Sequence, residues 1–474
     1  MANSSNILPG VTFGIELEFI AVFPREFFLD FIEEGDNPDA VTGISRALSA
    51  DGIPSTGHES LEDDEQINSN AESYSMWNVA EEGGLRLSDS ERIAWRLEVA
   101  STECRIESVE VSSRKLRISE DWQSEVAKVL QNLKDLADAG CRFITNASTG
   151  LHVHIALGDQ RMPLRTVKNV LQLCTAFERR LDSLYPTNRS DPDNAYKRSA
   201  PSHFNANLSW HFGSNKHTSF ARNICHWLSA IEECSTYEEL GKFFKNDLVN
   251  VNSNGEANVH HTNFHFSTLN LENLYSNHTD DGAEPTGTIE FRQHDGTLDL
   301  KEISAHVLFK ALLVSFCHTT SDIDFLKLCS QASNPEFQLN DFFAAIGMNG
   351  ELLDHYRQRF SAENVDRKNA EFMQNIAKLQ DEDSVFDLEV LQAQSEAEKH
   401  TRNTPIAVAQ KIEEKANMGA YPDLNMRPFD IEGEYMKFVQ LNGPAIHDAE
   451  KLSNLARTMV FQQLDDSQPF QYWA

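Results

Sequence analysis

Four segments of this chain alternate apolar and polar residues at every second position, and their polar positions carry acids, histidines or an arginine. The segments cover residues 11–23, 105–112, 151–157 and 287–294. Side chains two residues apart on a β-strand project to the same side of the sheet, so each segment predicts a strand with one apolar and one reactive face. If these strands lie side by side, their apolar faces require a layer of helices behind them.

The reactive faces of the four predicted strands have a distinctive composition. Strand parity brings together eight groups: Glu16, Glu18, Glu110, His152, His154, Glu290, Arg292 and His294. Several carboxylates this close repel one another unless a cation lies between them, and carboxylates are good ligands for hard ions such as Mg²⁺. An arginine among them can bind a phosphate or a carboxylate through two parallel hydrogen bonds. The set therefore predicts phosphate chemistry on bound metal rather than metal storage.

Each piece of this set also has a plain structural interpretation when it is taken alone. A Glu-x-Glu pair is usually the solvated face of a sheet, a His-x-His pair need not hold metal, and Glu-x-Arg-x-His can be a surface ladder of salt bridges. Glu107 competes with Glu110, but parity places Glu107 with the apolar residues of its strand, where we expect packing or a salt bridge. The joint occurrence of all the pieces favours a functional site.

Helical patterns separate the strands. Apolar residues at three- and four-residue spacing predict helices over 120–139, 164–184 and 301–317, the first capped by Ser119 and ended by Gly140. Further strands are expected at 142–148, adjacent to 151–157, and at 258–271. Beyond about 325 the chain reads as helical and highly charged to about 418, then as an irregular tail with four prolines. These patterns predict an α+β fold with a catalytic domain over 11–325 and a mainly helical extension over 326–474.

Bulk composition limits the partners and the compartment. The 474 residues are 40% hydrophobic and 24% charged, and the formal net charge is −32. Nucleic acid and anionic membranes need a basic face, so neither is expected as a partner. The seven cysteines are scattered without a Cys-x-x-Cys pair, and neither a signal peptide nor a membrane-spanning run is evident. We therefore expect a cytoplasmic protein.

An ordered set of motifs resembles the amidoligase family, which belongs to the carboxylate–amine ligase superfamily with glutamine synthetase and glutamate–cysteine ligase. The motifs are GIELEF, VEVSSRKL, TGLHVHIAL, NRSDPDNAY, STLNLENL and TIEFRQHDGTLD, and they cover roughly residues 11–320. Three positions depart from the family pattern: Glu82 and Gly84 stand where an Asp and a Ser are expected, and Ser113 stands where a Pro often follows the second strand.

The resemblance implies a glutamine-synthetase-like curved antiparallel sheet, with helices on its convex face and ATP and two magnesium ions on its concave face. One metal would be held by Glu16, His152 and Glu290, and the other by Glu18 and Glu110. Arg292 would neutralise the phosphoryl group in transit, His154 would lie beside the nucleotide or a metal, and His294 would support the site or contact substrate. Arg189 and Arg198, in a polar loop, are candidates for the substrate carboxylate, although both can equally be solvated loop arginines.

The reaction that the resemblance implies is the ATP-dependent formation of an amide or isopeptide bond through an acyl phosphate. Its substrates would be a small-molecule or peptide carboxylate and an amine, and the sequence leaves their identity and the oligomeric state open. Three alternatives stand beside this hypothesis. The chain could be a non-catalytic descendant that only binds nucleotide or metal, a metal-dependent hydrolase or oxygenase using His-x-His and Glu290, or an enzyme that phosphorylates a guanidine or amine without ligation.

Overall fold

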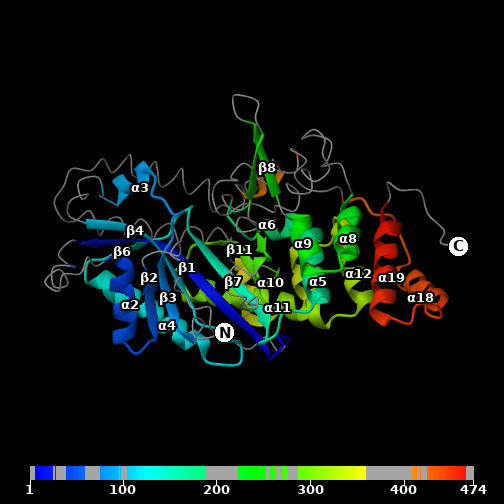
Figure 1. The fold of residues 1–474 in the computed structure, drawn as a ribbon, viewed down its shortest axis with the longest axis horizontal. Coiled ribbons are helices and arrows are strands. Elements are labelled where there is room, and N and C mark those ends of the chain that lie inside the picture. The colour runs from blue at the N-terminus through cyan, green and yellow to red at the C-terminus, as the bar shows by residue number, and fades with distance from the viewer. Residues whose placement is uncertain are drawn as a thin grey trace.

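A large, mostly antiparallel sheet forms one end of the molecule (Figure 1). The computed structural model describes residues 6–24, 27, 39–58, 75–95, 97, 104–186, 189, 223–244, 246–251, 257–262, 268–275, 287–358, 408–410, 412–413, 417 and 424–465. Within these residues the main path of the sheet runs β10-β11-β7-β1-β4-β3-β2, and β5 and β6 also pair with β1. The strands are β1 (Val11–Pro24), β2 (Ser55–His58), β3 (Trp77–Glu81), β4 (Cys104–Ser112), β5 (Leu116–Arg117), β6 (Arg142–Ile144), β7 (Gly150–Leu157), β10 (Leu269–Asn270) and β11 (Ile289–Asp295).

The four alternating segments form the centre of this sheet, as predicted. Strand β1 pairs antiparallel with both β4 and β7, and β7 pairs antiparallel with β11. The apolar positions of β1, such as Phe13, Leu17 and Phe19, are buried in the main core. One pair departs from the antiparallel pattern, because β2 lies parallel to β3 at the edge.

Two strand predictions need correction. The segments at 142–148 and 151–157 do not lie next to each other, because β6 and β7 follow one another along the same edge of β1. The expected strand at 258–271 is split in two. Strand β9 (Ala257–Thr262) forms a separate hairpin with β8 (Asn246–Val251), which stands out from the body in Figure 1, while β10 pairs with β11 in the main sheet.

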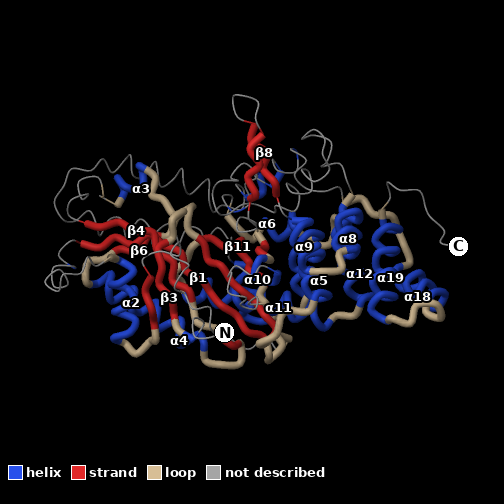
Figure 2. Tube along the Cα trace, viewed as in Figure 1, coloured by secondary structure: helices blue, strands red, loops and turns tan. Residues whose placement is uncertain are grey.

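Helices cover the apolar face of the sheet. Helices α2 (Ala40–Ala50), α4 (Trp122–Asp138) and α11 (Leu300–Thr319) contact the strands from one side and share the main core with them (Figure 2). The predicted cap of α4 is wrong at its start, since Asp121 rather than Ser119 is the N-cap residue. Gly140 follows the end of α4 with a φ of 102°, a conformation that favours glycine. The predicted helix over 164–184 breaks at Phe177 into α5 (Leu164–Ala176) and α6 (Glu178–Asp182).

The C-terminal part is more regular than expected. Helices α18 (Ile431–Asn442) and α19 (Ala449–Leu464) occupy most of the described part of the predicted irregular tail. Pro428 and Pro444 flank α18 at its two ends, where proline is tolerated, so they delimit this helix rather than prevent it. The prediction of an irregular tail is therefore wrong over these residues.

The two C-terminal helices pack against the end of the molecule that is built from helices (Figures 1 and 2). Helix α19 contacts α8 (Ile224–Glu233) and α12 (Asp322–Ser330), and α18 contacts α12. The predicted boundary between 11–325 and 326–474 falls inside α12, and the division into two domains stays a prediction. The remaining helices of this region are α9 (Tyr237–Phe244), α10 (Glu272–Tyr275), α13 (Leu339–Ala345) and α14 (Gly350–Gln358), with α3 (Asp89–Ala94) near the sheet.

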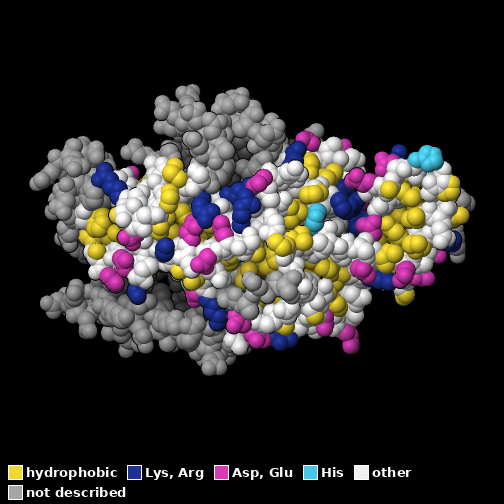
Figure 3. Space-filling model, turned by 90° about the horizontal axis from the view of Figure 1, so that it is seen from below, with side chains coloured by type: hydrophobic (Ala, Val, Ile, Leu, Met, Phe, Trp, Pro, Cys, Tyr) yellow, Lys and Arg dark blue, Asp and Glu magenta, His cyan; other side chains and the backbone are white. Residues whose placement is uncertain are grey.

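Exposed hydrophobic side chains lie on the two C-terminal helices. Figure 3 shows hydrophobic side chains at the end of the molecule where α18 and α19 lie, and Met436, Leu441 and Leu455 are exposed there. Among the helices that the structure describes, none combines the length and the apolar character needed to cross a membrane.

Candidate metal and phosphate site

The cross-strand register brings seven of the eight predicted groups onto one face of the sheet. Glu16 lies opposite His152 on one side and opposite Ser112 on the other, and Glu18 lies opposite Glu110. His154 lies opposite Glu290. The site is therefore a grid of neighbouring side chains across the four central strands β4, β1, β7 and β11, with Arg292 beside Glu290 on the last of them.

Two groups of potential metal ligands share one imidazole. The first is Glu16, His152 and Glu290, the second is Glu18, Glu110 and His152, and within each the ligand atoms all lie within 4.8 Å of one another. His152 is buried between them, with its Nδ1 atom 2.9 Å from Glu16 Oε2 and 3.6 Å from both Glu18 Oε1 and Glu290 Oε1. The structure thus brings together the residues of each predicted ligand set and places His152 near both, while metal binding by them stays a prediction.

Hydrogen bonds hold one oxygen of several of these carboxylates. The backbone N–H of Gly150 donates to Glu18 Oε2 at 2.7 Å, and the Ser112 hydroxyl donates to Glu110 Oε1 at 2.7 Å. In both cases one oxygen is committed to the protein, and the other oxygen of Glu18, Oε1, lies 3.6 Å from His152 Nδ1. Such bonds orient ligands before a metal arrives.

The ionisation of the site shows a shortage of positive charge. Burial, together with the charges of Glu16 and Glu18, raises the pKa of Glu110 well above its ordinary range. Burial alone would also raise the pKa of Glu16, but the charge of His154 and hydrogen bonds from both histidines outweigh burial and hold it well below its usual value. For His154, burial is outweighed by the charges of Glu16 and Glu290, which raise its pKa to about 9. Several carboxylates gathered around one imidazole form a donor set that fits a hard divalent cation such as magnesium.

Arg292 supplies the one guanidinium in the predicted set. It is buried and forms an ion pair with Glu290. Burial would lower the pKa of Arg292, but the charges of Glu290, Glu18 and Glu16 raise it. For Glu290, burial is likewise offset by Arg292, whose charge holds the pKa of this carboxyl below its usual value. A fixed positive charge thus lies beside an ionised carboxylate at the edge of the first group.

The parity prediction is wrong at His294. The register shifts by a β-bulge between Phe291 and His294, so His294 lies opposite Leu151, whose side chain packs in the main core. Its ring lies 4.6 Å from that of His306 on α11, measured between centroids, and its Nε2 atom lies 3.8 Å from Glu302 Oε2 on the same helix. A bulge inserts one residue and reverses the facing of the residues after it. His294 therefore lies on the helix side of the sheet, away from the two ligand groups.

The structure describes one of the two candidate loop arginines, Arg189. Arg189 is buried and donates a hydrogen bond to the backbone oxygen of Thr149, next to the start of β7. It is therefore not a solvated loop arginine, and it lies close to the second ligand group. Arg198 lies outside the described residues. Glu82, at one of the positions that depart from the family pattern, is buried, and its backbone N–H donates to Ser108.

Glu107 behaves as parity predicts. It lies on the opposite side of β4 from Glu110, where it forms an ion pair with Arg105 and accepts a hydrogen bond from the N–H of Ala40 at the start of α2. Burial raises its pKa. Its contacts are those of a structural carboxylate, so it provides a matched comparison for the acids of the site.

Two asparagines belong to the site although sequence reasoning gave them no role. Asn270 on β10 donates to Glu290 Oε2 at 2.7 Å, and the amide of Asn273 lies 3.2 Å from His154 Nδ1. Both lie in the STLNLENL motif, which supports the family resemblance but in which no site residue was predicted. No local pattern marks Asn270, because its place opposite Glu290 depends on the pairing of β10 with β11.

We expect Gly150→Ala to disrupt the site without unfolding the chain. A Cβ atom at this position would lie 2.6 Å from His152 Nε2 and 3.1 Å from Glu18 Oε2, so the shared imidazole and one carboxylate must move. The affinity for Mn²⁺, measured by titration with electron paramagnetic resonance, should fall by about 10- to 100-fold. The matched control is Gly14→Ala on β1, whose added Cβ would contact only His154 Cβ and Ser113 Oγ at 3.8 Å. Equal affinities in the two variants would contradict this geometry.

Comparison with known protein families gives a match over more than half of the chain. Residues 9–314 match the family described as "Putative amidoligase enzyme". The matched range begins just before β1 and ends within α11, so it contains every residue of the two ligand groups and Arg292. The chain matches none of the curated proteins or solved structures to which it was compared.

Proposed function

Because the chain belongs to the amidoligase family, we propose that it is an ATP- and magnesium-dependent ligase that joins a carboxylate to an amine. The observation that carries the proposal is the pair of ligand groups that meet at His152, with Arg292 at their edge. The family match supports an enzyme of the ligase type. The nucleotide, the metal and the acyl phosphate are the parts that we propose.

In this proposal Glu16, His152 and Glu290 hold one magnesium ion, and Glu18 and Glu110 hold the other with His152 between them. Bound magnesium would neutralise the crowded carboxylates and the phosphates of ATP, which is its usual role in phosphoryl transfer. The face that carries these residues would be the concave side of a glutamine-synthetase-like sheet. His154, which is the less buried of the two histidines, would lie beside the nucleotide.

The proposed reaction has two steps. A carboxylate oxygen of the first substrate attacks the γ-phosphorus of ATP, the bond to the β-phosphate oxygen breaks, and ADP leaves. An amine then attacks the carbonyl carbon of the acyl phosphate, phosphate leaves, and the amine loses a proton as the amide forms. The acid and the amine can be small molecules or parts of a peptide. Arg189, buried near the second ligand group, is proposed to bind the substrate carboxylate.

The protein contributes position and charge. Arg292 is fixed by its ion pair with Glu290, so its guanidinium is placed to neutralise the phosphoryl group while it moves between oxygens. Because Glu290 and His152 are buried, water is largely excluded from this part of the site, which protects an acyl phosphate from hydrolysis.

The geometry does not favour the hydrolase or oxygenase alternative. A site of that kind uses two histidines and one carboxylate on the same metal. Among the residues that the structure describes, each of the two ligand groups contains His152 but not His154. His154 instead directs its Nε2 atom to Glu16 Oε1 at 2.7 Å.

The proposal is tested by a screen for ADP release. Purified protein is incubated with Mg²⁺-ATP and mixtures of amino acids, polyamines and small peptides, and mass spectrometry identifies the condensation product. We expect ADP and the product to form in equal amounts and only when acid, amine and magnesium are all present. A stable phosphorylated amine would indicate a kinase instead, and ATP binding without turnover in any mixture would indicate a non-catalytic descendant.

Metal binding should release protons at neutral pH. Glu110 and His154 both have pKa values raised above the ordinary range in the metal-free site, and a cation beside them favours their deprotonated forms. The apparent affinity for Mg²⁺ should therefore rise with pH and level off above about 9. Calorimetric titrations at pH 7.5 in two buffers of different ionisation enthalpy measure the released protons. Proton uptake, or an affinity that falls as the pH rises toward 9, would contradict this expectation.

A further inference from the structure

Asn270 forms two hydrogen bonds that fix both ends of its amide. The side chain is buried at the end of β10, directly opposite Glu290 on β11. Its Oδ1 atom accepts a hydrogen bond of 2.9 Å from the N–H of Glu272, at the start of α10. Since that oxygen is occupied by a donor, the other end of the amide must be its NH₂ group, and this group donates to Glu290 Oε2 at 2.7 Å.

The two carboxylate oxygens of Glu290 therefore have different partners. Oε2 is bound by Asn270, and Oε1 faces His152 Nδ1 at 3.6 Å and the guanidinium of Arg292. An amide donor favours the ionised carboxylate without adding charge to it. A carboxylate held in this way can offer only Oε1 to the centre of the first ligand group.

We infer that Asn270 is a positioning residue that commits Glu290 to a single oxygen ligand for the metal of the first group. This inference rests on the proposed function, because it takes the two ligand groups to be metal sites. The residue touches neither metal nor substrate, so it acts through Glu290.

A matching arrangement in the second group makes the inference specific. There Ser112 donates to Glu110 Oε1, as Asn270 donates to Glu290 Oε2. The two donors lie on opposite flanks of the site, on β4 and β10, and each donates to a carboxylate of a different ligand group. Removing one donor should therefore weaken one metal site and leave the other unchanged.

The test is the titration of Mn²⁺, followed by electron paramagnetic resonance, in the full chain and its variants. Asn270→Asp keeps an oxygen to accept from Glu272 but replaces the donor facing Glu290 with an acceptor, and Asn270→Ala removes both bonds. We expect two bound Mn²⁺ ions in the unchanged protein. Either variant should weaken one of them by about 10- to 100-fold, the usual effect of losing a residue that orients a metal ligand. Thermal melting checks that each variant is folded.

Ser112→Ala is the matched control. Alone it should weaken one Mn²⁺ ion, and combined with Asn270→Asp it should weaken both, because the two donors serve different groups. The inference is overturned if Asn270→Asp and Asn270→Ala titrate like the unchanged protein, or if the combined variant retains one tight ion. A chain that binds no Mn²⁺ at all before substitution would overturn the proposed function, and the inference with it.

Discussion

Glu290→Gln should reduce ATP-dependent turnover on the order of 10³-fold, the size of loss that follows removal of one electrostatic group from a phosphoryl-transfer site. The substitution keeps the shape of the side chain and removes its charge. Glu290 belongs to the first ligand group and forms the ion pair that fixes Arg292. One change therefore weakens a metal site and frees the guanidinium that is proposed to neutralise the phosphoryl group. ADP release under saturating Mg²⁺-ATP measures the effect.

Glu107→Gln is the control for this prediction. Glu107 lies on β4 with Glu110, but on the other side of the strand, where it contacts Ala40 and Arg105. Removing this charge should leave ADP release within about twofold of the unchanged protein, because Glu107 belongs to neither ligand group and contacts neither of them. If Glu290→Gln and Glu107→Gln gave the same activity, the face of the sheet that carries the ligand groups would not be the active site.

Strand parity was sufficient to predict which side chains of β1, β4 and β7 lie together, because these three strands pair without interruption. Glu16, Glu110 and His152 lie together because β1 keeps a regular register with both β4 and β7 over these residues. The same rule fails at His294 because one bulge in β11 reverses the facing of the strand. The apolar alternation ends at Phe291, because Gln293 stands where the next apolar residue would, and this break alone does not distinguish a bulge from the end of a strand.

Local sequence patterns could not predict contacts between residues that are far apart in the chain. Asn270 has a meaning only when β10 is placed beside β11, and the parallel strand β2 arises within a segment of low apolar content. Arg457 is the clearest case, because it lies in the segment predicted as an irregular tail, where a charged residue is normally solvated. Its partners Glu232 and Asn169 are 225 and 288 residues away in the chain. Periodicity within a window of one helix carries no information about such partners.

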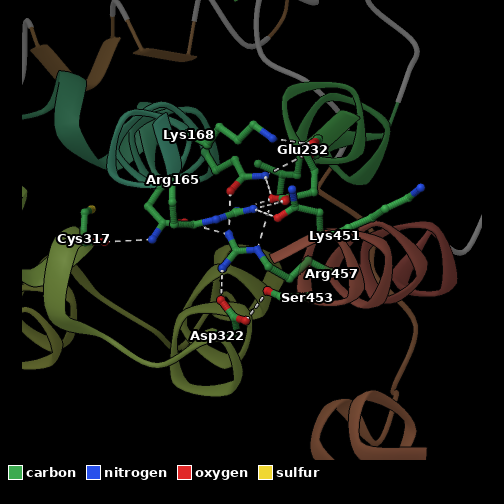
Figure 4. A network of polar contacts seen from close by, with 12 residues as sticks. Arg165, Lys168, Glu232, Cys317, Asp322, Lys451, Ser453 and Arg457 are labelled. Carbon is green, nitrogen blue, oxygen red and sulfur yellow. Dashed lines mark hydrogen bonds and ion pairs between the residues drawn. The ribbon is translucent and has the colours of Figure 1, made fainter. Parts of the chain in front are cut away.

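Arg457→Met should destabilise the chain by about 3–5 kcal/mol, the usual cost of removing one partner of a buried ion pair. Arg457 on α19 is fully buried, and its guanidinium bonds Glu232 at 3.0 Å, Asp322 at 2.9 Å, Asn169 at 2.7 Å and Gln172 at 2.9 Å (Figure 4). These residues come from α8, α12 and α5, so one side chain joins the C-terminal helix to three others. The free energy of unfolding, from urea titration followed by circular dichroism, measures the loss.

The destabilisation should come mainly from the buried carboxylate of Glu232, which keeps Arg165 but loses Arg457 as a partner. Burial would raise its pKa, but Arg457 and Arg165 outweigh burial and hold this pKa at about 2. Because the folded-state pKa lies below the value of 4.5 for a free side chain, the pair stabilises the fold above that pH and loses its contribution as the pH falls toward 2. The difference in the free energy of unfolding between Arg457→Met and the unchanged protein should accordingly become smaller as the pH falls below about 4.5.

Two further variants separate this charge effect from a simple loss of packing. Glu232→Gln combined with Arg457→Met should be less destabilised than the sum of the single changes, since the carboxylate that loses Arg457 as a partner is then absent. Lys437→Met, which removes an exposed ion pair with Glu434 on α18, should change stability by less than about 0.5 kcal/mol. If the effects of Glu232→Gln and Arg457→Met on the free energy of unfolding were strictly additive, a stabilising charge interaction between the two residues would be contradicted. Arg457 would then stabilise the fold through its packing on Phe325, where its guanidinium lies 4.7 Å from the ring centroid.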